Sequence, residues 1–125
     1  MHEVEHEEFE AFVARAVHDL PDEFRERISN VEFAVEDWAR PEDFARTEAP
    51  RGSTLLGVYR GIPLTKRGSH YNMAMPDRIV IFRQPLQQLA FDQRDLADRV
   101  AHVVRHEVAH YFGISDERLR EIDAY

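Results

Sequence analysis

Three histidines stand one helical turn apart at positions 102, 106 and 110, and a glutamate directly follows the second of them. The segment His106-Glu107-Val108-Ala109-His110 therefore has the pattern HExxH. Residues i and i+4 of an α-helix lie on one face, with Cβ atoms about 5 to 6 Å apart. Two imidazoles at that spacing can bind one Zn²⁺ at about 2.0 to 2.1 Å, and the glutamate can hold a water beside it. The pattern predicts a metal site with Glu107 as a general base.

The residues that follow extend this pattern to HExxHxxGxxD. Gly113 can turn the chain out of the helix in the left-handed conformation, and Asp116 can then return an oxygen ligand to the metal. Composition alone predicts the full pattern about 0.0001 times per chain, so it is a specific signal. Two imidazoles and a carboxylate leave a fourth position open, as at catalytic zinc sites. We expect one Zn²⁺ per chain, held by His106, His110 and Asp116, although non-haem iron uses the same ligand types.

The third ligand has alternatives. Asp116 could be the N-cap or a first-turn acid of a last helix, and that role is compatible with metal binding. Glu121 and Asp123 are the other carboxylates that a last helix could fold back towards the metal. The sequence favours Asp116 because of its fixed spacing from Gly113.

The other histidines are weaker candidates for site residues. His2-Glu3-Val4-Glu5-His6 is a second HExxH, but it lies at a terminus, no glycine follows it, and Phe12 occupies the place of a third ligand. We interpret it as a solvated helix start. His102 is the solvated edge of the site or a donor to a carboxylate, and we favour the edge. His70 and Tyr71 could donate to a developing oxyanion, but an ordinary polar loop is the simpler interpretation.

The elements that must position this site form an α+β fold. Hydrophobic periodicity predicts helices at 5–20, 21–30, 93–112 and 115–123. Residues 31–36 and 54–59 have the pattern of strands, and the apolar run within 78–83 predicts a strand covered on both faces. The other segments are a loop at 38–53 with a helical turn at 41–45, a return at 62–64, an irregular loop at 65–77 and a connector at 85–91. We therefore expect a single domain over residues 1–125, with about three strands packed against helices.

The long helix at 93–112 carries two stripes. Its apolar stripe should face the core and consists of Leu96, Val100, Val104, Val108 and Tyr111 or Phe112. The histidine stripe is offset by two residues, or roughly 200° of rotation, so we expect it to line a cleft.

Composition excludes several classes of protein. Sixteen Lys and Arg against 24 Asp and Glu give a net charge of −8, which repels phosphate backbones and anionic membranes. The absence of cysteine excludes disulfides, Cys-ligated zinc and a thiol nucleophile. No apolar run reaches the roughly 18 residues of a membrane span, and glutamates replace the basic start of a signal peptide. We expect a cytoplasmic monomer that binds neither nucleic acid nor membranes.

The extended motif resembles that of the zincin metallopeptidases. Its continuation Asp116-Glu117-Arg118-Leu119 and the segments 56–64 and 76–80 are similar to the small single-domain bacterial zincin-like family, and the likeness covers about 9–123. This resemblance implies a minimal zincin fold with metal-dependent peptidase activity. Metzincins differ because they carry histidine at the position of Asp116 and a methionine turn after the site, whereas no methionine follows His110 here.

Two classes of function remain open. The first is a zinc-dependent metallopeptidase that hydrolyses a peptide or protein substrate, which could add as a strand to a sheet edge near 55–59. The second is a non-catalytic metal-binding or regulatory module, because 125 residues leave little chain for a substrate-shaping domain. A third possibility is a metal-dependent hydrolase of non-peptide substrates; its RNA version is disfavoured by the net charge and by the glutamate directly after the first histidine, which suits amide hydrolysis.

Overall fold

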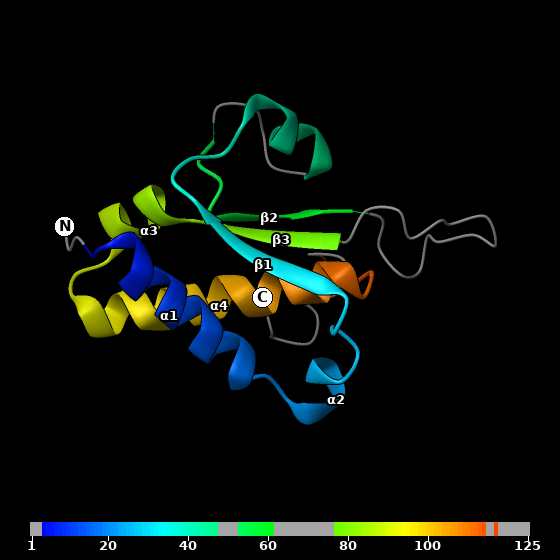
Figure 1. Ribbon diagram of the computed structural model, residues 1–125. Helices are drawn as coiled ribbons and strands as arrows, with labels where there is room; N and C mark the ends of the chain where they lie inside the picture. The colour runs from blue at the N-terminus through cyan, green and yellow to red at the C-terminus, as the bar shows by residue number, and fades with distance from the viewer. Residues whose placement is uncertain (1–3, 48–52, 62–76, 115–116, 118–125) are drawn as a thin grey trace.

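The computed structural model describes residues 4–47, 53–61, 77–114 and 117. In these residues helices surround a small mixed sheet, as the α+β prediction requires (Figure 1). The elements in chain order are α1 (His6–His18), α2 (Asp22–Arg25), β1 (Val31–Glu36), the 3₁₀ helix η1 (Pro41–Arg46), β2 (Gly57–Arg60), β3 (Asp77–Phe82), α3 (Arg83–Leu89) and α4 (Gln93–Tyr111).

The three strands pair in the order β1-β3-β2. β3 is central and runs parallel to β1 and antiparallel to β2. Its residues Ile79 to Phe82 are fully buried, which confirms the prediction of a strand covered on both faces. β2 begins at Gly57, three residues later than the sequence pattern predicts, and it lies at an edge of the described sheet.

Two layers of helix cover the sheet. α1 and α4 pack against one face, and η1 lies over the other (Figure 1). The predicted apolar stripe of α4 faces the larger core, where Leu96, Val100 and Val104 are fully buried. The smaller cluster on the opposite face contains Leu55, Val58, Val80 and Phe82. The sheet therefore fixes the rotation of α4 about its own axis.

The expectation of a connector at 85–91 is wrong, because most of this segment belongs to α3. Pro85 lies in the first helical turn, where its missing N–H removes no intrahelical hydrogen bond. Gln87 is fully buried and its side chain accepts a 2.6 Å hydrogen bond from the N–H of Val4, whose carbonyl accepts one from Arg83. A helix this short depends on such tertiary contacts, which sequence periodicity does not reveal.

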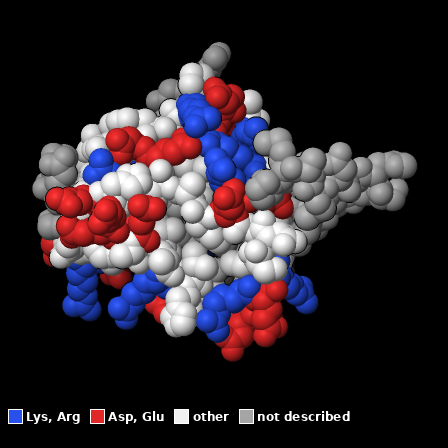
Figure 2. All heavy atoms as spheres, in the orientation of Figure 1, with Lys and Arg blue, Asp and Glu red and all other residues white. Residues whose placement is uncertain are grey.

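Several predicted features lie outside the described residues. These are the return at 62–64, most of the loop at 65–77, and all of the last helix at 115–123 except Glu117. The 3₁₀ helix η1 confirms the helical turn expected at 41–45. Among the described helices, none is both long and apolar enough to cross a membrane. Acidic side chains gather on the side of the molecule where α1 begins (Figure 2), and the exposed acids there are Glu5, Glu7, Glu8 and Glu10.

Candidate metal centre

Helix α4 is held at both ends by the caps that the sequence predicts. The Asp92 side chain accepts a 2.8 Å hydrogen bond from the N–H of Asp95. At the other end Gly113 has a φ of 79°, in the left-handed region, and its N–H donates to the His110 carbonyl. The helix ends at Tyr111, one residue earlier than predicted. Regular helical geometry therefore continues through the whole HExxH segment.

The HExxH side chains converge on one side of α4. Ligand atoms of His106, Glu107 and His110 all lie within 4.8 Å of one another. The two imidazole rings have centroids 4.5 Å apart and are inclined at 70°. Nitrogens bound to one tetrahedral zinc would lie about 3.4 Å apart, given bonds of about 2.0 to 2.1 Å. Small ring rotations would satisfy this requirement, so the described donors fit a metal ion of the zinc type.

Glu107 is buried although it carries a carboxylate, with only 6% of its surface exposed. Its Oε1 atom lies 3.2 Å from the Nδ1 atom of His110. If Nδ1 carries the proton, it donates to this carboxylate, and Nε2 then carries the lone pair that can bind a metal. Glu107 is therefore placed to orient a ligand as well as to accept a proton from water.

His102 lies outside this group. It is exposed, and its ring centroid is 6.5 Å from that of His106. Within the part of the chain that the structure describes, its side chain has no hydrogen bond or ion pair. This position corresponds to the solvated edge that the sequence favours.

The other predicted site residues are not brought to this group by the described structure. Asp116, the predicted third ligand, lies outside the described residues, as do Glu121, Asp123, His70 and Tyr71. In the N-terminal HExxH, His6 is exposed at the start of α1 and lies 3.6 Å from Glu10. That arrangement is what a solvated helix start should show.

Sequence reasoning missed Gly57, the first residue of β2. A Cβ atom built on this glycine would lie 2.7 Å from Cγ1 of Val103 and 3.3 Å from Cγ of Glu107. The backbone of β2 therefore passes directly against α4 beside the general-base candidate. The one signal in the sequence is a glycine at a strand position, which commonly marks the close approach of another element.

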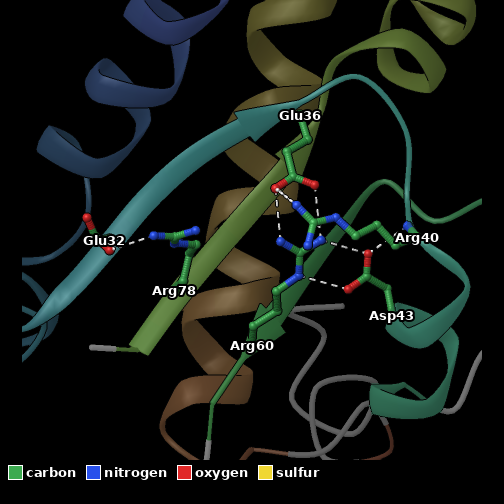
Figure 3. A network of polar contacts seen from close by, with 6 residues as sticks. All are labelled: Glu32, Glu36, Arg40, Asp43, Arg60 and Arg78. Atoms are coloured by element: carbon green, nitrogen blue, oxygen red, sulfur yellow. Dashed lines mark hydrogen bonds and ion pairs between the residues drawn. The ribbon is translucent and has the colours of Figure 1, made fainter. Parts of the chain in front are cut away.

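A second polar cluster lies on the opposite face of the sheet (Figure 3). The Arg60 guanidinium, at the end of β2, donates from Nε and Nη2 to the Asp43 carboxylate, at 2.8 Å each. Its Nη1 and Nη2 atoms also donate to Glu36 at 2.9 and 3.1 Å. Arg40 adds a 3.2 Å contact to Glu36 and a backbone N–H to Asp43. These four residues, hereafter the Arg60 network, tie β2 to β1 and η1.

The charges of the Arg60 network shift each other's protonation. The hydrogen bond from Arg60 lowers the pKa of Glu36 below its ordinary value, although partial burial opposes this. Burial raises the pKa of Asp43, but the hydrogen bonds from Arg60 and from the Arg40 backbone outweigh it and leave a lowered pKa. Both carboxylates therefore remain charged at neutral pH and hold the edge strand in place.

Comparisons with known proteins bear on the fold and on the family of this chain. A comparison with curated proteins finds no match. A conserved hypothetical protein from T. thermophilus has a similar solved structure, with a TM-score of 0.58 and 20% sequence identity over 87% of this chain and 94% of that chain. At this identity the similarity establishes the fold alone. The family model described as zincin-like metallopeptidase matches residues 28–125, and the chain belongs to that family.

Proposed function

We propose that this protein is a zinc-dependent metallopeptidase that hydrolyses peptide bonds. The observation that carries the proposal is the convergence of His106, Glu107 and His110, which places a buried carboxylate close to two candidate ligands. A structural zinc site would be closed by four protein ligands, whereas the predicted set of two imidazoles and the Asp116 carboxylate would leave a fourth position for water. Membership of the zincin-like metallopeptidase family supports the same reaction class.

In this reaction the histidines and the aspartate would bind the metal, and Glu107 would transfer the proton. His106 and His110, with Asp116, would hold the metal, which when bound supplies a water of lowered pKa and polarises the substrate carbonyl. Glu107 accepts a proton from the attacking water and delivers it to the leaving amine as the peptide bond breaks. The low exposure of Glu107 keeps bulk water from competing for that proton.

The edge of β2 is suited to hold an extended peptide. Opposite residues in an antiparallel pair alternate between hydrogen-bonded and non-hydrogen-bonded positions. The N–H of Phe82 donates to the Leu56 carbonyl at 3.0 Å, so the next pair, Gly57 with Ile81, is of the non-hydrogen-bonded kind. The N–H and carbonyl of Gly57 therefore point away from β3. A peptide that pairs with them would lie beside Glu107, within the 55–59 segment where the sequence predicts docking.

Substituting Glu107 with glutamine tests this function. Wild-type protein, the Glu107→Gln variant and a surface control, Glu7→Gln in α1, would be loaded with zinc and incubated with a peptide library. We expect Glu107→Gln to lower cleavage by at least about 100-fold, because a general base contributes 10² to 10⁴ in rate. Zinc content should stay equal in all three proteins. Equal cleavage by Glu107→Gln and wild type would refute the mechanism.

Loss of turnover and loss of metal have different meanings in this experiment. If the wild-type protein retains zinc but cleaves no peptide in the library, the non-catalytic metal-binding module becomes the better description. If the wild-type protein retains no zinc, the prediction of a zinc site is wrong.

A further inference from the structure

We propose that Gly57 is a positioning residue for Glu107: the missing side chain of Gly57 leaves the space that lets Glu107 keep its carboxylate beside His110. This inference rests on the proposed function, because it concerns the accuracy with which the general base is placed.

Gly57 is required for space rather than for backbone conformation. Of the described glycines, Gly113 is the one with a positive φ, so the backbone of Gly57 is one that any residue could adopt. A glycine in a strand costs stability because it gains no packing and loses more chain entropy. A Cβ on Gly57 would lie 2.7 Å from Cγ1 of Val103 and 3.3 Å from Cγ of Glu107, and both distances are shorter than ordinary carbon contacts, so the lack of space explains why a glycine is found here.

Contacts on β3 and at both ends of β2 limit how far the strand can shift to make room for a side chain. A Cβ on Gly57 would also lie 3.2 Å from the Val80 carbonyl oxygen on the neighbouring strand β3, so a sideways shift of β2 towards β3 gives no room. Just before β2, the Leu56 carbonyl accepts a hydrogen bond from the N–H of Phe82 on β3. At the other end of β2, Arg60 donates hydrogen bonds within the Arg60 network. Added volume at Gly57 must therefore displace side chains of α4.

Of the two α4 side chains in contact, Glu107 has the greater freedom to move. Val103 is β-branched and has one strongly preferred rotamer in a helix, so its methyl group cannot easily turn away. Glu107 can rotate about its side-chain bonds, and a displaced Cγ carries the carboxylate away from the Nδ1 atom of His110, now 3.2 Å away. Displacing a catalytic group by 1 Å can cost about 100-fold in rate. Gly57 thus protects the position of Glu107.

Three variants separate positioning from stability: Gly57→Ala, Val103→Ala and the double variant. We expect Gly57→Ala to lower both the urea midpoint and kcat, the latter on the order of tenfold. In the double variant, Val103→Ala removes the Cγ1 atom that would lie 2.7 Å from the new Cβ at position 57. The Cγ atom of Glu107, 3.3 Å from that Cβ, remains. The double variant should therefore recover the urea midpoint of Val103→Ala, while its kcat remains roughly threefold or more below that variant. Zinc content and KM should be equal in both.

A second measurement does not require peptidase activity. The ring ¹⁵N shifts of His110 in metal-free protein report whether Nδ1–H donates to Glu107. We expect these shifts to move in the double variant and to match wild type in Val103→Ala. If wild type lacks activity but these shifts move, the proposed function fails while the positioning role stands. If both kcat and the His110 shifts of the double variant equal those of Val103→Ala, the positioning role is refuted.

Discussion

The Oε1 atom of Glu107 lies 3.2 Å from the Nδ1 atom of His110, one helical turn further along α4. The carboxylate that is the candidate general base is therefore also the partner of a candidate metal ligand. Such a partner selects the tautomer of the imidazole and the orientation of its ring. The spacing of HExxH thus has two effects: it brings the two histidines together, and it places beside His110 the carboxylate that can orient its ring.

Removal of either imidazole of the HExxH motif should strongly weaken zinc binding, whereas removal of the His102 imidazole should not. We expect His106→Ala and His110→Ala to weaken zinc affinity by more than about 100-fold, since even outer partners of ligands contribute 10- to 100-fold. His102→Ala is the matched control, because it is on the same helix one turn before His106 but outside the converging group. Competition titration with a chromophoric chelator measures all three. Equal affinity of His110→Ala and His102→Ala would contradict the site.

The third ligand can be identified by comparing two neighbouring acids. Asp116→Ala should lower zinc affinity at least about tenfold if its carboxylate binds the ion, while Glu117→Ala should leave the affinity unchanged. Glu117 is a suitable control because it is exposed and of like charge. The same chelator titration applies. If the two variants bind zinc equally, the ligand must be sought at Glu121 or Asp123.

Breaking the Arg60 network should cost more stability than breaking an ion pair on the surface. Asp43 is fully buried, so Asp43→Ala leaves part of the Arg60 guanidinium uncompensated and should cost about 3 kcal/mol of unfolding free energy. The control is Glu32→Ala, which breaks the exposed pair of Glu32 and Arg78 (Figure 3) and should cost less than about 1 kcal/mol. Urea denaturation measures both. Similar losses would show that the Arg60 network contributes no more than a surface pair.

Acid should destabilise the protein through the same network. The pKa values of Glu36 and Asp43 are lowered in the folded state, so their contribution is complete above the unfolded values, near 4.5 and 3.8. That contribution is lost as pH falls through the lowered folded-state values. Unfolding free energy should therefore decline below about pH 4, and the decline should be shallower in a Glu36→Gln/Asp43→Asn variant. Denaturation series across pH 2 to 7 would show this, and parallel curves for the two proteins would contradict it.

Local patterns predicted the parts of the fold that depend on local rules. Asp92 and Gly113 have the side chain and the backbone freedom that end a helix, and they cap α4 in the structure. The apolar run at 79–82 predicts a covered strand because both of its faces need apolar contacts, and that strand is β3. Helix α3 was not predicted because its stability comes from contacts with residues far away in the chain, such as the hydrogen bond between Gln87 and Val4.

The sequence by itself determined the chemistry of the candidate site. HExxH places two imidazoles and a carboxylate on neighbouring positions of one helix, and a helix has a fixed 3.6-residue turn, so their convergence needs no tertiary information. Only the tertiary structure decided what lies against that helix. Gly57 and Glu107 are 50 positions apart in sequence, and no local pattern encodes a contact that arises because β2 is anchored to β3 and to the Arg60 network while its backbone meets α4.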